Sequence, residues 1–141
     1  MVVDDKLFFS SLSGNQCNQY LSRIQAVRKA LAQPGIDTKN SNPDFGITHE
    51  KSMVIDEEVA FVKSLNWASK NLTETRDYAI TTPHPHKVAG IIAFFDADWH
   101  RKQFKPVESA RLIWCPTNGR DRIARFIDEA TQRRAFPTTN S

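Results

Sequence analysis

The chain reads Thr48-His49-Glu50-Lys51-Ser52-Met53-Val54-Ile55-Asp56 near its middle, and the apolar run Val59-Ala60-Phe61-Val62 follows closely. Both segments have the composition of β-strands, and Asp56-Glu57-Glu58 would join them. Residues i and i+2 of a strand project from the same face, so His49 and Lys51 are expected side by side. An imidazole can attack or protonate a phosphate while a neighbouring ammonium neutralises its charge. The stretch therefore predicts a strand-turn-strand unit that handles phosphodiesters.

The composition is that of one ordinary globular domain. The chain has 141 residues, of which 40% are hydrophobic and 25% are charged. Its formal charge of +3 and pI near 9.0 mildly favour anionic partners. No apolar run approaches the ~20 residues that span a bilayer, and no signal peptide is evident at the N-terminus. We therefore expect an intracellular protein, or a piece cut from a longer chain, in which Cys17 and Cys115 are ordinary thiols.

Periodicity predicts an α/β fold, in which helices flank a mixed β-sheet. One amphipathic helix from about Asn18 to Ala32 would pack on the sheet, and Val59–Val62 would form a strand buried on both faces. The remaining expected elements are strands at 36–39, 48–55, 59–64, 78–82 and 110–115, helices at 88–99 and 120–134, and a loop or helical turn at 67–73.

The order of several polar residues resembles a known family. His49-x-Lys51, four further residues and Asp56 are similar to the HKD signature of the phospholipase D superfamily. The resemblance continues in Lys63-Ser64-Leu65-Asn66 and in Asp77, and it covers most of residues 16–134. It implies a phospholipase D-like sandwich.

Two later segments also look like parts of this superfamily. Residues 94–99 resemble the end of the first half of bacterial two-motif members, and residues 110–134 resemble the strand and helix that open the next half.

The resemblance implies a role for each matching residue. His49 would be the nucleophile that forms a phosphohistidine, and a histidine from a second motif would protonate the leaving oxygen. Lys51, Ser64 and Asn66 would hold the non-bridging oxygens, and Asp77 would hydrogen-bond the imidazole. The mechanism requires neither a metal nor another cofactor.

Two residues of the signature region need a separate interpretation. Asp56 is a site residue by its place in the signature, but it lies an odd number of residues from His49. On an unbroken strand it would point to the other face, so we expect it to hold the turn or neighbouring backbone. Lys63 stands where the family usually has glycine, so either the backbone differs there or an extra cation borders the site.

The chain contains one complete His-x-Lys-x4-Asp signature. His100-x-Lys102 has Val107 in place of the aspartate, and neither His84 nor His86 has a lysine two residues on. Either two chains each supply a motif in a homodimer, or this is half of a larger enzyme. The sequence thus predicts a phospholipase D-type phosphodiesterase that hydrolyses or transfers a phospholipid or nucleic acid diester. The alternative is a non-catalytic half-domain that binds phosphate or a partner. For His84-Pro85-His86, a proline-stiffened loop is preferred to a metal pair.

Overall fold

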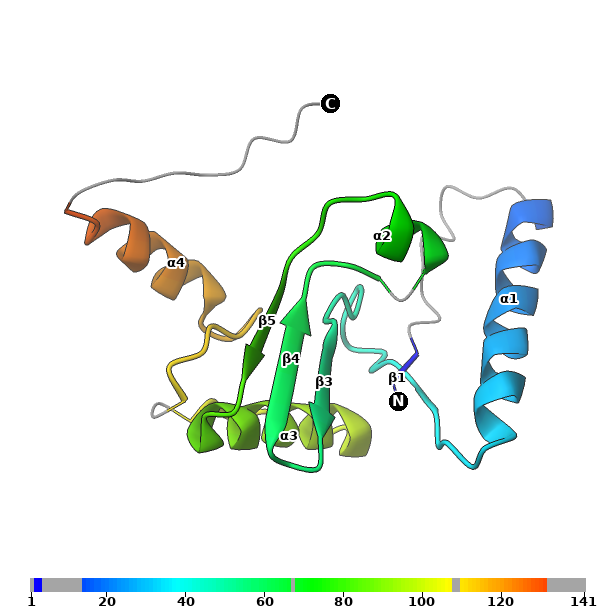
Figure 1. Ribbon diagram of the computed structural model, residues 1–141, viewed down its shortest axis with the longest axis horizontal. Helices are drawn as coiled ribbons and strands as arrows, with labels where there is room; N and C mark the ends of the chain where they lie inside the picture. Colours follow the sequence, from blue (N-terminus) through cyan, green and yellow to red (C-terminus); the bar gives the residue numbers. More distant parts are fainter. Residues whose placement is uncertain (1, 4–13, 67, 108–109, 132–141) are drawn as a thin grey trace.

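The computed structural model describes residues 2–3, 14–66, 68–107 and 110–131 (Figure 1). Its core is a three-stranded antiparallel sheet with helices around it, which confirms the predicted α/β class. The elements in chain order are β1 (Val2–Val3), α1 (Gly14–Ala32), β2 (Lys39–Asn40), β3 (Ser52–Ile55), β4 (Val59–Lys63), α2 (Ser69–Thr73), β5 (Ala79–Thr82), α3 (Pro85–His100) and α4 (Gly119–Asp128). Strands β1 and β2 form a separate parallel pair.

Strand β4 lies at the centre of the sheet, between β3 and β5. The register aligns Ser52 with Val62 across one pair and Lys63 with Ala79 across the other. Figure 1 shows that β3 begins, β4 ends and β5 begins at the same end of the sheet, which is the end nearest α2. The β3–β4 turn lies at the opposite end.

Helix α3 supplies the hydrophobic core. Its sequence places Pro85 in the first turn, where proline fits a helix, and spaces Val88 and Ile91 three residues apart on one face. Val88 and Ile91 are 1% and 3% exposed and pack with Ala60 of β4, which is fully covered. Val54 of β3 adds to this cluster. The helix thus covers the face of β3 and β4 that holds Val54 and Ala60.

The segment after α3 returns to the same helix through aromatic packing. The rings of Phe94 and Trp114 stack at 4.9 Å between centroids, and Phe104 meets both edge-on at 5.0 and 4.9 Å. Gly90 permits this approach, since a Cβ there would lie 3.1 Å from the Cβ of Ala110. The region after α3 therefore packs against the core through this cluster of three rings.

The prediction of a strand at residues 110–115 was wrong, because these residues form no strand. Arg111 has a φ of 51°, which interrupts an extended backbone. The N–H of Trp114 donates to Oδ1 of Asn118 at 2.7 Å and so belongs to a turn. Trp114 and Leu112 of this segment pack in the core with α3 and not within a sheet, whereas Ile113 is 46% exposed, and periodicity does not separate the two cases. The helix that follows ends at Asp128, whereas residues 132–134 lie outside the described part.

Two packing predictions were also wrong. Helix α1 stands beside the three-stranded sheet in Figure 1, with Leu21 38% and Val27 48% exposed. A hydrogen bond from Arg28 to Oδ1 of Asn40 connects α1 to β2. Strand β4 is not buried on both faces, because Val59 and Phe61, which alternate with the buried Ala60, are only half-buried. One face of this apolar strand is covered by α3, and the described residues cover the other face only in part.

Several element boundaries differ from the prediction. The strand expected at residues 36–39 is the shorter β2, and the strand expected from Thr48 begins only at Ser52. The expected loop at His84-Pro85-His86 is the start of α3, where His84 is the N-cap residue. Among the described residues, no helix is long and apolar enough to cross a membrane.

A matched pair of substitutions tests the position of the core. Ile91→Ala removes a buried side chain and should lower the free energy of unfolding by about 2–5 kcal/mol. Ile80→Ala makes the same change at a residue that is 71% exposed, and its cost should stay within about 1 kcal/mol. Urea denaturation measures both. Equal losses would contradict the packing of α3 on β4.

Candidate functional site

The residues predicted to act on phosphate gather at the end of the sheet nearest α2 (Figure 1). The N–H of Lys63 donates to the C=O of Lys51 at 3.1 Å, which extends the β3–β4 ladder by one residue. The N–H of Ser64 donates to the C=O of Tyr78 at 2.9 Å, which extends the β4–β5 ladder in the same direction. Asp77 precedes β5 by two residues. Backbone pairing therefore brings three separate segments to one place.

Asp77 is the centre of a hydrogen-bond network. The hydroxyl of Ser64 donates to its Oδ1 at 2.8 Å, and the hydroxyl of Thr75 donates to its Oδ2 at 2.6 Å. These two bonds, with a smaller contribution from Asn71, lower the pKa of the Asp77 carboxyl below its ordinary 3.8. Ser64 is itself fixed by the N–H of Tyr78, which donates to its Oγ at 3.1 Å. The network holds Asp77 as a carboxylate at the rim of the sheet.

His49 and Lys51 lie next to this network on the segment that leads into β3. The Nζ of Lys51 donates to the C=O of His49 at 2.7 Å, and desolvation lowers the pKa of Lys51. The His49 side chain is exposed and makes no hydrogen bond to the residues that the structure describes. Among the described residues, Asp77 accepts from Ser64 and Thr75, and the structure gives no hydrogen bond between Asp77 and the imidazole.

Two partners in this region were missed from the sequence. Thr75 stands two residues before Asp77, a spacing that places both side chains on one side of an extended segment. That spacing was the available signal. Asn71 donates through Nδ2 to Oγ1 of Thr75 at 3.2 Å from α2, and the four-residue spacing of this pair was the signal for that contact.

Glu50 is a further titratable group between His49 and Lys51. Although the residue as a whole is exposed, desolvation of its carboxyl raises the pKa of Glu50. The hydroxyl of Ser52 donates to it and acts in the opposite direction, while the negative charge of Asp98 on α3 raises the pKa further. This carboxyl belongs to the α3 side of the sheet end.

The other two predicted residues differ in position. Asn66 is exposed two residues beyond Ser64, close in sequence to the gathered groups. Asp56 lies in the β3–β4 turn at the far end of the sheet (Figure 1). Asp56 and Glu57 have φ values of 52° and 57°, and the N–H of Glu58 donates to Ile55 at 3.0 Å, which is a type I′ turn. Asp56 is thus a turn residue and is not near His49.

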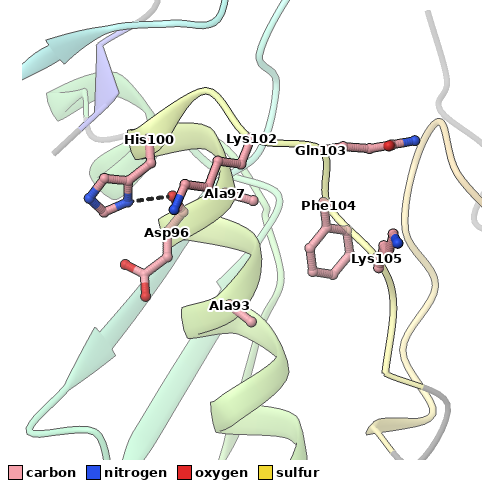
Figure 2. Close-up of a pocket in the computed structure, with 8 residues that line it drawn as sticks. All are labelled: Ala93, Asp96, Ala97, His100, Lys102, Gln103, Phe104 and Lys105. Carbon is pink, nitrogen blue, oxygen red and sulfur yellow. Dashed lines mark hydrogen bonds between the residues drawn. The ribbon is translucent and has the colours of Figure 1, made fainter.

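A hollow of about 450 Å³ opens at the C-terminal end of α3 (Figure 2). Figure 2 shows the ring of His100 beside Asp96, whose carbonyl oxygen lies 2.9 Å from Nδ1. Lys102 and Lys105 also line it, but His49, Lys51, Ser64 and Asp77 do not. The hollow is therefore separate from the residues gathered at the sheet end.

A metal centre was considered among the described residues. Their His, Cys, Asp and Glu side chains form no group of three or more that could hold a metal ion. The rings of His84 and His86 lie 5.7 Å apart, at a mutual tilt of 43°.

Comparison with known families identifies the fold. The family model described as "Cardiolipin synthase, PLD-like domain" matches residues 9–99, which is more than half of the chain. The chain belongs to this phospholipase D-like family. The matched range contains the whole sheet, His49, Lys51 and the Ser64–Asp77 pair. No curated protein and no solved structure matches the chain. Membership in the family agrees with the α/β architecture around the sheet.

The Asp77 network generates a pH-dependent prediction. Thr75→Val removes the first of the hydrogen bonds that lower the pKa of Asp77, so that pKa should rise towards 3.8. Because the folded-state pKa is depressed, the stabilisation from this carboxylate is present above its ordinary pKa and disappears as the pH falls through the folded value. The variant should lose it at a higher pH than the wild type.

Carboxyl ¹³C NMR titration of Asp77 measures this change directly. Thr75→Ser keeps a hydroxyl at the same position and should titrate like the wild type. Identical titration curves for the wild type and Thr75→Val would show that the bond from Thr75 does not control Asp77.

Proposed function

We propose that this chain is a phosphodiesterase unit of the phospholipase D type, in which His49 forms a phosphohistidine. The observation that supports the proposal is the coincidence of two findings. The family match encloses His49-x-Lys51, and backbone pairing brings this pattern to the same sheet end as Ser64 and Asp77. Neither the pattern nor the fold alone would support it as well.

The proposed reaction has two displacement steps. A ring nitrogen of His49 attacks phosphorus, a P–N bond forms and the P–O bond to the leaving alcohol breaks. A second histidine gives its proton to the leaving oxygen. The same histidine then takes a proton from water or an acceptor alcohol, whose oxygen attacks phosphorus as the P–N bond breaks. Hydrolysis and transfer differ only in this acceptor.

The neighbouring residues suit the charge that develops on the phosphoryl oxygens. Lys51 uses one N–H on the carbonyl of His49 and retains two further donors for a phosphate. The hydroxyl of Ser64 donates to Asp77, so it must rotate before it can donate to substrate. A carboxylate accepts about four hydrogen bonds, so Asp77 keeps capacity for the imidazole of His49. Asn66 would add an amide donor.

The second histidine of the proposed site would come from a second motif. His49 of a second copy of the chain is the simplest source, and a histidine of a second half-domain is the other. The family description names a phospholipid enzyme, which favours a phospholipid diester over a nucleic acid as the substrate. Asp56 takes no chemical part in this scheme, because it belongs to the distant turn.

The nucleophile is tested with His49→Asn on bis(p-nitrophenyl)phosphate. Turnover should fall on the order of 1,000-fold or more, since the group that bonds to phosphorus is removed. Acid-labile labelling of the chain by a ³²P-phosphodiester should disappear as well. His86→Asn makes the same substitution at an exposed residue of α3 and should retain both activities. If the wild-type chain shows neither turnover nor labelling, the proposal is contradicted and the alternative, a non-catalytic binding unit, is supported.

A mixing experiment tests whether the active site needs two copies. If each site uses His49 from two chains, activity should fall with the square of the wild-type fraction when His49→Asn protein is added and subunits exchange. Independent sites would instead give a linear fall. Light scattering of the same mixtures establishes the oligomeric state, and an active strict monomer would exclude the two-copy arrangement.

A further inference from the structure

Lys63 departs from the glycine usual in the family at this position, and the structure decides between the two explanations for that departure. The residue ends β4 in regular pairing with Ala79, and its N–H completes the ladder to Lys51. Its φ is not among the left-handed values of the chain. The backbone is therefore an ordinary strand at this point, and the difference is the side chain itself.

Lys51 and Lys63 are direct cross-strand neighbours. The register pairs Ser52 with Val62, so the next position outward pairs Lys51 with Lys63. Directly opposed residues of an antiparallel pair project from the same face, with Cβ atoms roughly 5 Å apart. Val54 and Ala60 lie an odd number of residues away and face α3, so the two lysines occupy the other face.

Both charges of this pair are held close to protein. Each side chain is half-buried. Desolvation lowers the pKa of Lys63, and the charge of Lys51 lowers it further. Like charges placed opposite each other destabilise a sheet. An anion bound beside the pair would relieve this repulsion, and it would do so more strongly the more negative charge it brought.

We propose that Lys51 and Lys63 form a two-lysine anion subsite, which selects phosphodiesters that have a second phosphate near the scissile one. The inference rests on the proposed function, because the scissile phosphate is taken to lie at His49 and Lys51. Lys51 serves the reacting phosphate, and Lys63 adds the charge that distinguishes a more anionic substrate from a simple diester. The role requires the positive charge of Lys63 and not a particular hydrogen bond.

The test measures anion binding to the full chain by isothermal titration calorimetry, without any need for turnover. The probes are pyrophosphate, which has several negative charges, and dimethyl phosphate, which has one. The wild type should prefer pyrophosphate. Lys63→Gln should weaken pyrophosphate binding about 10-fold, and dimethyl phosphate binding much less, because the Coulomb energy scales with ligand charge. Lys63→Arg keeps the charge and should preserve the preference.

Lys105→Gln is the matched control. It removes one lysine charge from the segment after α3, outside the sheet end, and should bind both probes like the wild type. Circular dichroism and thermal melting confirm that each variant is folded. Rising ionic strength should reduce the pyrophosphate preference of the wild type more than that of Lys63→Gln.

Three outcomes would overturn the inference: no pyrophosphate preference in the wild type, equal behaviour of Lys63→Gln and Lys105→Gln, or an equal loss on both probes. The result is separable from the phosphohistidine proposal. If the chain shows a charge preference that depends on Lys63 but no turnover that depends on His49, the anion subsite is supported and the phosphohistidine proposal is contradicted. If it shows turnover but no charge preference, the phosphohistidine proposal is supported and the subsite is contradicted.

Discussion

The antiparallel register of β3, β4 and β5 is the constraint on which the rest of the structure depends. It aligns Ser52 with Val62 and Lys63 with Ala79, and these alignments determine which side chains share a face. A slip of one residue would move Ala60 away from α3 and turn Lys63 towards it. The core and the Lys51–Lys63 pair are thus two consequences of the same hydrogen-bond ladder, with one on each face of the hairpin.

Packing against α3 fixes that register. Ala60 is fully covered by Val88 and Ile91, and a larger or polar side chain at this point of β4 would not fit. The core lies against α3, while the reactive groups lie where the strands end beside α2. This division is physically reasonable, because ammonium and carboxylate groups would lose hydration inside a packed core. At the strand ends, the ammonium and carboxylate groups keep enough contact with water to stay charged and accessible to a ligand.

Much of the candidate site could be predicted from the sequence, and its contacts could not. His49 and Lys51 are close neighbours in the sequence itself, although the strand begins only at Ser52, and Asp56 lies in the β3–β4 turn, as expected from its offset. The hydrogen-bond partner of Asp77 could not be predicted in this way. Ser64 is 13 residues away, and only pairing between β4 and β5 brings its hydroxyl to the carboxylate. Once that bond and the one from Thr75 exist, the carboxylate is held without the imidazole.

The sequence by itself determined the α/β class, the β3–β4 hairpin, the helical period of α3 and the identity of the reactive side chains, because these follow from local alternation and composition. Only the tertiary structure decided that residues 110–115 pack on α3 as an irregular segment, that α1 stands beside the sheet and that Lys63 lies opposite Lys51. Apolar residues of a strand, a helix or a loop are equally hydrophobic. What they are buried against depends on segments distant in the chain.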